Sequence, residues 1–185
     1  MVTIKCEIEG VCAMLFKRLT EEIAEGIVTG VNKKYTEKER KKFAENHVYK
    51  KTPRSNIGVP ALNLKKCLLE GCISSGVKCG RKSATQYVRA TVFIDPDFLD
   101  LGQKKPDGIH AATVRIPPRT GARVMGYWPY VDAGWKLNFH FNLFDERITP
   151  ELLKVALTEA GTIKGLCDHR PEYGRFKINR FDLEE

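Results

Sequence analysis

Segment 165–178, GLCDHRPEYGRFKI, gathers several side chains that could act on a phosphate ester. His169 stands beside Arg170 and four residues before Tyr173. Imidazole titrates near neutral pH and can transfer protons, and a neighbouring tyrosine or lysine could assist at a scissile phosphate. His140, which we expect on the open face of a strand, is another candidate. No spacing forces these groups together, so we expect no catalytic residue and keep His169, His140 and Tyr173 as the alternative of a metal-independent endoribonuclease.

The same loop could instead bind an anion. Gly165 and Gly174 allow the backbone to turn its amides toward a phosphate. Three cations add positive charge around them: Arg170, Arg175 and Lys177. The alternative is a tight connection in which the arginine pairs with Asp168 or Glu172.

Segment 113–135 combines arginines with aromatic rings. The arginines recur at four-residue intervals, and the rings follow them: Arg115, Arg119 and Arg123, then Tyr127, Trp128, Tyr130 and Trp135. Arginine contacts phosphates, and each base stacked on an aromatic ring is worth about 1–3 kcal/mol. This composition is typical of a protein that binds single strands, with stacking on Tyr127 and Trp128. The alternative is a packed hairpin whose arginines only keep it in solution.

The charge balance favours an anionic polymer as partner. The chain has 31 Lys and Arg against 23 Asp and Glu, a net charge of +8, and a pI near 9.2. Such a balance biases a protein toward nucleic acid. We expect single-stranded nucleic acid, RNA in preference to DNA, to contact the following residues: Lys41, Lys42, Lys50, Lys51, Arg54, Lys78, Arg81, Lys82, Arg115, Arg119, Arg123, Tyr127, Trp128, Arg170, Arg175 and Lys177.

No cofactor or metal is expected from the sequence. The six cysteines do not form the paired knuckles of a structural zinc site, and Cys67 and Cys72 fit the apolar stripe of a helix. No phosphate-loop, dinucleotide-binding or metalloprotease pattern occurs. The chain opens on an amphipathic strand without a signal peptide, and no apolar run reaches membrane-spanning length. We therefore expect a cytoplasmic protein with no membrane partner.

Hydrophobic periodicity predicts an α+β fold. Alternating Ile4, Cys6 and Ile8 indicate a strand, and Pro60 and Thr149 with Pro150 mark helix starts. The predicted strands are 3–10, 87–95, 109–116, 135–144 and 175–179, and the predicted helices are 36–46, 60–72 and 150–160, the last ending at Gly161. This order fits a ferredoxin-like or RRM-like antiparallel sheet with helices on one face. We expect one domain over 1–185, with a basic insertion or helix at 31–58 and a hairpin insertion at 101–134.

Three stretches resemble the repeat-associated mysterious protein (RAMP) superfamily, the ferredoxin-like RNA-binding subunits of CRISPR effector complexes. The opening strand with GVCAMLFKR resembles the first strand and turn of that superfamily, VPALNLKKCLLEGC its first helix, and GLCDHRPEYGRFKI its glycine-rich loop. The sequence departs from this pattern at Asn63, where serine is usual, at Cys67, and at Cys167 and Asp168. The chain resembles a set of small phage and prokaryotic proteins with GxGxxRPExGRF endings more closely still.

The resemblance implies a non-catalytic protein that binds single-stranded RNA and assembles along the strand, as a homo-oligomer or with CRISPR-type complex subunits. One alternative is a RAMP-type endoribonuclease that needs no metal. Another is a phage interaction protein that acts on a CRISPR-type complex and binds protein rather than RNA.

Overall fold

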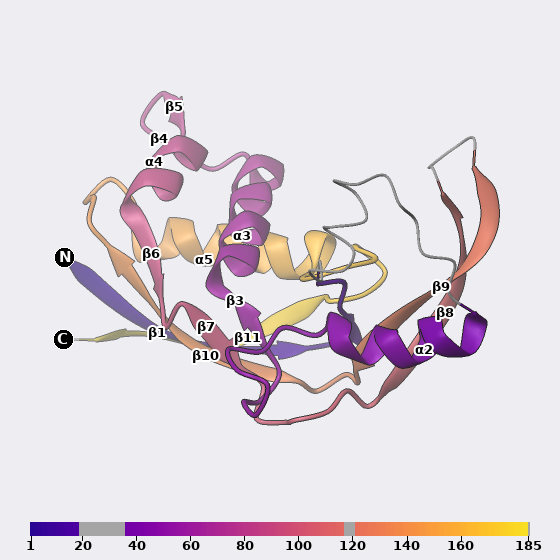
Figure 1. The fold of residues 1–185 in the computed structure, drawn as a ribbon. Coiled ribbons are helices and arrows are strands. Elements are labelled where there is room, and N and C mark those ends of the chain that lie inside the picture. Colours follow the sequence, from indigo (N-terminus) through magenta and orange to yellow (C-terminus); the bar gives the residue numbers. More distant parts are fainter. Residues whose placement is uncertain (19–35, 117–120, 185) are drawn as a thin grey trace.

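Figure 1 shows a computed structural model that describes residues 1–18, 36–116 and 121–184. Its centre is a four-stranded antiparallel sheet of order β11-β1-β10-β6. The strands are β1 (Val2–Gly10), β6 (Val92–Asp95), β10 (Lys136–Leu143) and β11 (Phe176–Glu184). Helices α3 (Ala61–Ser75) and α5 (Pro150–Glu159) lie side by side over one face of it (Figure 1). The predicted α+β class with helices on one face is confirmed.

Period-two alternation builds the core between this sheet and the helices. Ile4, Cys6 and Ile8 are buried opposite Phe141, Phe139 and Leu137 in the register of β1 and β10. Leu64, Leu68 and Cys72 of α3 and Leu153, Ala156 and Leu157 of α5 cover them. The other face of the sheet therefore remains open.

Two predicted elements differ from the structure. Segment 87–95 begins as helix α4 (Ala84–Thr91) and becomes strand β6 only at Val92, so the predicted strand was wrong over its first half. The predicted helix end at Gly161 was also wrong, because the chain continues through the π-helix η2 (Ala160–Lys164) to Gly165. A Cβ on Gly161 would lie 2.3 Å from the Phe176 carbonyl oxygen, so this glycine permits close packing on β11 rather than ending the helix.

A second sheet extends from the body as a long hairpin. It contains β8 (Gly108–Ile116) and β9 (Ala122–Val131), and β2 (Met14–Leu15) pairs with the base of β9. Helix α2 (Glu37–Ala44), with the predicted capping box at Thr36, lies against β9 and leads into η1 (Glu45–His47) (Figure 1).

Two short strand pairs complete the architecture. They join β3 (Gly58–Pro60) to β7 (Phe98–Asp100), and β4 (Lys78–Cys79) to β5 (Lys82–Ser83). None of the helices in the described residues is long and apolar enough to cross a membrane.

Candidate nucleic-acid interface

Two glycines allow loop 165–175 to fold back tightly on itself. Gly165 and Gly174 both have a φ of 75°, which favours glycine, and a Cβ on Gly174 would lie 2.0 Å from the Leu166 carbonyl oxygen. The amides of Gly165, Leu166 and Gly174 donate to the carbonyls of Ala160, Gly174 and Ala13. These amides are already engaged, so the expectation that the two glycines turn them toward an anion was wrong.

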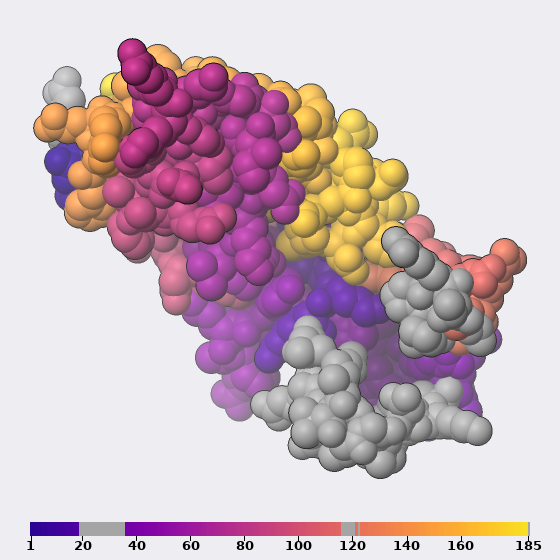
Figure 2. Space-filling model, turned by 90° about the horizontal axis from the view of Figure 1, so that it is seen from above, coloured from indigo at the N-terminus to yellow at the C-terminus, as the bar shows by residue number. Residues whose placement is uncertain are grey.

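The loop links the helical layer to the hairpin. Asp168 forms a β-bridge with Leu15, and its Oδ2 accepts a hydrogen bond of 2.6 Å from Trp128 Nε1. Asn63 at the start of α3 interacts with the side chains of Tyr49 and Cys167. Figure 2 shows the yellow loop beside indigo residues of the N-terminal segment. Segments far apart in the sequence therefore meet at this loop.

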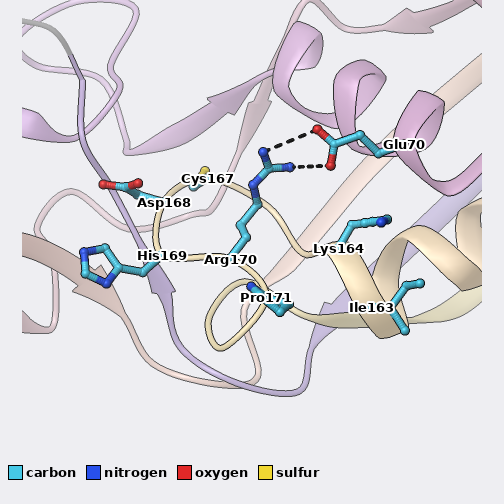
Figure 3. A pocket seen from close by; sticks show the side chains of 8 residues that line it. All are labelled: Glu70, Ile163, Lys164, Cys167, Asp168, His169, Arg170 and Pro171. Carbon is cyan, nitrogen blue, oxygen red and sulfur yellow. Dashed lines mark hydrogen bonds and ion pairs between the residues drawn. The ribbon is translucent and has the colours of Figure 1, made fainter. Parts of the chain in front are cut away.

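A shallow cavity of about 600 Å³ lies on the side of the loop that faces α3. Figure 3 shows the Arg170 guanidinium reaching toward Glu70 of α3, while His169 points the other way. The two nitrogens of Arg170 lie 3.0 and 3.4 Å from the Glu70 carboxylate. The arginine is thus paired, as in the tight-connection alternative, but with Glu70 rather than with Asp168 or Glu172.

Two histidines and a tyrosine meet on the hairpin side of the loop. The ring centroids of His169 and His110 lie 5.9 Å apart, and those of His110 and Tyr173 lie 5.3 Å apart. His169 also contacts Trp128 at 4.3 Å between centroids, and its φ of 54° is a left-handed conformation that costs a non-glycine residue about 1–3 kcal/mol. The sequence made His110 a candidate for acid–base chemistry by residue type alone, and no spacing predicted that this residue of β8 would meet His169 and Tyr173.

The predicted stacking surface is not open. Tyr127 and Trp128 are 8% and 3% exposed, because Tyr127 donates to Glu37 of α2 and Trp128 to Asp168. Lys17 Nζ lies 4.4 Å from the centre of the Trp128 ring. The expectation of base stacking on these two rings was wrong, and the packed-hairpin alternative describes them better.

The arginines of the hairpin are exposed. Arg115 and Arg123 lie directly opposite each other on β8 and β9, where like charges destabilise a strand pair. Further cations along the hairpin come from residues 17–18, where Lys17 lies over Trp128, and from α2, which packs on β9 with Arg40 near Tyr127. We call this set the basic cluster: Lys17, Arg18, Lys38, Arg40, Lys41, Lys42, Arg115 and Arg123. None of them forms an ion pair with a described residue.

Carboxylates near the basic cluster are engaged by neutral donors instead. Glu37 accepts from the Tyr127 hydroxyl at 2.6 Å, and Glu39 accepts from Thr36 in the capping box at 2.7 and 2.8 Å. Asp168 accepts from Trp128. Burial lowers the pKa of Lys17, which Asp168 partly opposes. Among the residues that the structure describes, no carboxylate therefore pairs with the cations of the basic cluster.

The open face of the central sheet has the opposite arrangement. Lys136 lies 3.9 Å from Glu7 and 3.8 Å from Glu9, and Lys177 lies 3.4 Å from Glu9. His140 lies 3.4 Å from Glu184 on β11. Acids therefore neutralise this face, and His140 is far in the fold from the His110 and His169 pair.

The remaining predicted cations do not converge on one place. Lys51 pairs with Asp97 at 2.8 Å, Lys50 donates to the Lys104 carbonyl, and Arg54 and Arg175 are exposed. Lys78, Arg81 and Lys82 lie on the β4–β5 hairpin, away from the basic cluster (Figure 1). Arg119 lies outside the described residues. Across those residues, no three His, Cys, Asp or Glu side chains come together as a metal ion would require.

Known proteins resemble the chain in fold. No family model and no curated protein sequence matches it. A solved chain with a similar fold belongs to the cryo-EM structure of the type III-B Cmr-beta bound to cognate target RNA, with a TM-score of 0.56 and 11% sequence identity. The match covers 100% of this chain and 61% of that chain, so this protein spans about three fifths of its neighbour's length. The chain thus shares its fold with a chain of the type III-B Cmr-beta structure.

Proposed function

We propose that this chain binds single-stranded RNA through the basic cluster, as a non-catalytic, RAMP-like subunit of a CRISPR-type complex. The observation that carries the proposal is that none of these eight cations forms an ion pair with a described residue, while Glu37, Glu39 and Asp168 are engaged by neutral donors. An anionic polymer would relieve the repulsion between Arg115 and Arg123. The shared fold with a chain of an RNA-bound complex supports RNA as that polymer.

The test is the salt dependence of RNA binding. Each phosphate contact on a single strand contributes a slope of about −0.7 to log K against log salt, so R115Q/R123Q should make the slope less negative by about 1.4. When the salt is raised from roughly 50 to 200 mM, the wild type should therefore lose about sevenfold more affinity for RNA than R115Q/R123Q does. Fluorescence anisotropy with labelled oligouridylate measures this change, and oligothymidylate tests RNA against DNA.

K136Q/K177Q is the matched control, because it removes the same charge from the neutralised sheet face. We expect this variant to bind like the wild type. Equal losses in both variants would mean that net charge alone attracts RNA, and a wild-type slope near zero would rule out the proposal.

A second candidate function is metal-independent cleavage of the RNA. The meeting of His110, His169 and Tyr173 favours it, because two imidazoles could act as general base and general acid at one phosphate. Cleavage of structured RNA in the presence of a chelator, lost in both H110A and H169A, would support this function. Intact RNA after long incubation with the wild type would exclude it.

A further inference from the structure

A second group of cations is carried by the β4–β5 hairpin, which lies at the end of the helical layer away from β8 and β9 (Figure 1). There the β4–β5 hairpin, α4 and the start of α5 border an open hollow of about 600 Å³. Four cations line it beside two large apolar side chains, and we call this set the basic cup: Lys78, Arg81, Lys82 and Arg147, with Tyr87 and Leu152.

One wall of the basic cup is the β4–β5 hairpin. Lys78, Arg81 and Lys82 are all exposed, and none pairs with an acid among the described residues. Strand pairing of Lys78 with Ser83 and of Cys79 with Lys82 holds these cations within one tight turn. The turn gathers like charges that would otherwise repel one another.

The opposite wall fixes a fourth cation. The Arg147 guanidinium lies 4.2 Å from the centre of the Tyr87 ring, and its nitrogens reach Asp145 at 2.6 and 2.8 Å. Hydrogen bonds from Arg147 lower the pKa of Asp145 to about 2. Because Arg147 already compensates this acid, the three hairpin cations keep their charge for a ligand.

The lining favours phosphate over a protein partner. Protein interfaces centre on buried aromatic or aliphatic anchors, whereas the cup has four cations beside Leu152 and Tyr87, and the guanidinium of Arg147 stacks on the Tyr87 ring. Lysine and arginine bind phosphate oxygens through charge-assisted hydrogen bonds. The positive end of the α5 dipole, at the cap residue Thr149, adds to this field.

We propose that the basic cup binds backbone phosphates of a nucleic-acid strand, as a second contact separate from the basic cluster. The inference rests on the proposed function for the identity of the strand, but the phosphate site itself stands on the geometry of the cup. An RNA long enough to reach both ends of the helical layer then gains contacts that a short one lacks.

Inorganic pyrophosphate and oligouridylate test the two parts separately. By calorimetry, we expect pyrophosphate to bind the wild type and R115Q/R123Q alike, and K78Q/R81Q/K82Q at least tenfold more weakly. With long oligouridylate, K78Q/R81Q/K82Q loses three phosphate contacts, so the slope of log K against log salt should become less negative by about 2. Between roughly 50 and 200 mM salt, the wild type should then lose roughly 20-fold more affinity than this variant. K5Q/K136Q/K177Q removes the same charge from the open sheet face and serves as the control.

The outcomes separate the two proposals. If the wild type binds RNA but K78Q/R81Q/K82Q keeps its full affinity and slope, the cup proposal is wrong and the basic cluster stands. If pyrophosphate binds the wild type and this variant equally, the cup is not a phosphate site. If pyrophosphate binds the cup but no RNA binds the wild type, the proposed function fails and the strand contact fails with it. Circular dichroism should show the same fold in all variants, since the replaced side chains are exposed.

Discussion

The hydrogen bond between Trp128 and Asp168 should hold the hairpin to the loop. The indole is 3% exposed, and its Nε1 lies 2.6 Å from the Asp168 carboxylate. W128F removes the donor and keeps an aromatic ring, while D168A removes the acceptor. Either change removes this hydrogen bond between β9 and loop 165–175 and leaves the backbone bridge between Asp168 and Leu15 in place.

The expected magnitude follows from the charge on the acceptor. A hydrogen bond to a charged group contributes about 1.5–3 kcal/mol, so the coupling free energy in a double-mutant cycle of W128F and D168A should fall in that range. In a chain of this length each 1 kcal/mol lowers the melting temperature by about 2–4 °C, which predicts a shift of about 3–12 °C from this bond. Urea unfolding at neutral pH gives the four free energies of the cycle.

Trp135 provides the matched control. It is 5% exposed, and its Nε1 donates to the neutral Cys12 carbonyl at 3.0 Å. W135F should lose about 0.5–1.5 kcal/mol of hydrogen bonding beside the loss of ring packing. A coupling between Trp128 and Asp168 below about 0.5 kcal/mol, the usual error of additivity, would refute this role of the bond.

Three other changes test neighbouring features. G174A should destabilise the protein by at least about 2 kcal/mol, because alanine there adds a clash with Leu166 to the strain of a left-handed backbone. G76A is the control and should cost less, because Gly76 has a φ of 65° but open space around it. Similar losses of unfolding free energy in urea for both variants would contradict this reasoning. Burial lowers the pKa of Lys65 to about 8. Between about pH 8 and 10.5 the unfolded chain therefore binds more protons than the folded chain, and the free energy of unfolding should rise with pH. A titration midpoint of Lys65 near 10.5 by NMR would disprove this pH dependence. Y127F removes the tie between β9 and α2, and amide hydrogen exchange in α2 should become faster; unchanged exchange would show that packing alone holds the helix.

Strong periodic patterns made most of the fold predictable. The alternation of Leu137, Phe139 and Phe141 allowed only a strand with one buried face. Segment 87–95 misled because its alternating apolar residues also fit a helical turn. Ser83, whose side chain accepts from the Thr85 amide, was the cap that marked the helix.

The site was less predictable because its contacts come from distant segments. The burial of Trp128 depends on Asp168, 40 residues further along the chain, and no local pattern indicates that pair. Glu70 lies 100 residues from its partner Arg170. The sequence showed which segments are rich in cations. It did not show which cations on the sheet would be paired with acids, because those pairs depend on the register between strands.

The closure of loop 165–175 has a consequence for protein engineering. The loop is bonded to β2, to β9 and to α3 at once, so the hairpin is rooted in the body at several points. A chimera that transplants only residues 108–131 to another scaffold would leave behind the partners of its buried indole. Any transplant of this appendage should therefore carry the glycine loop with it.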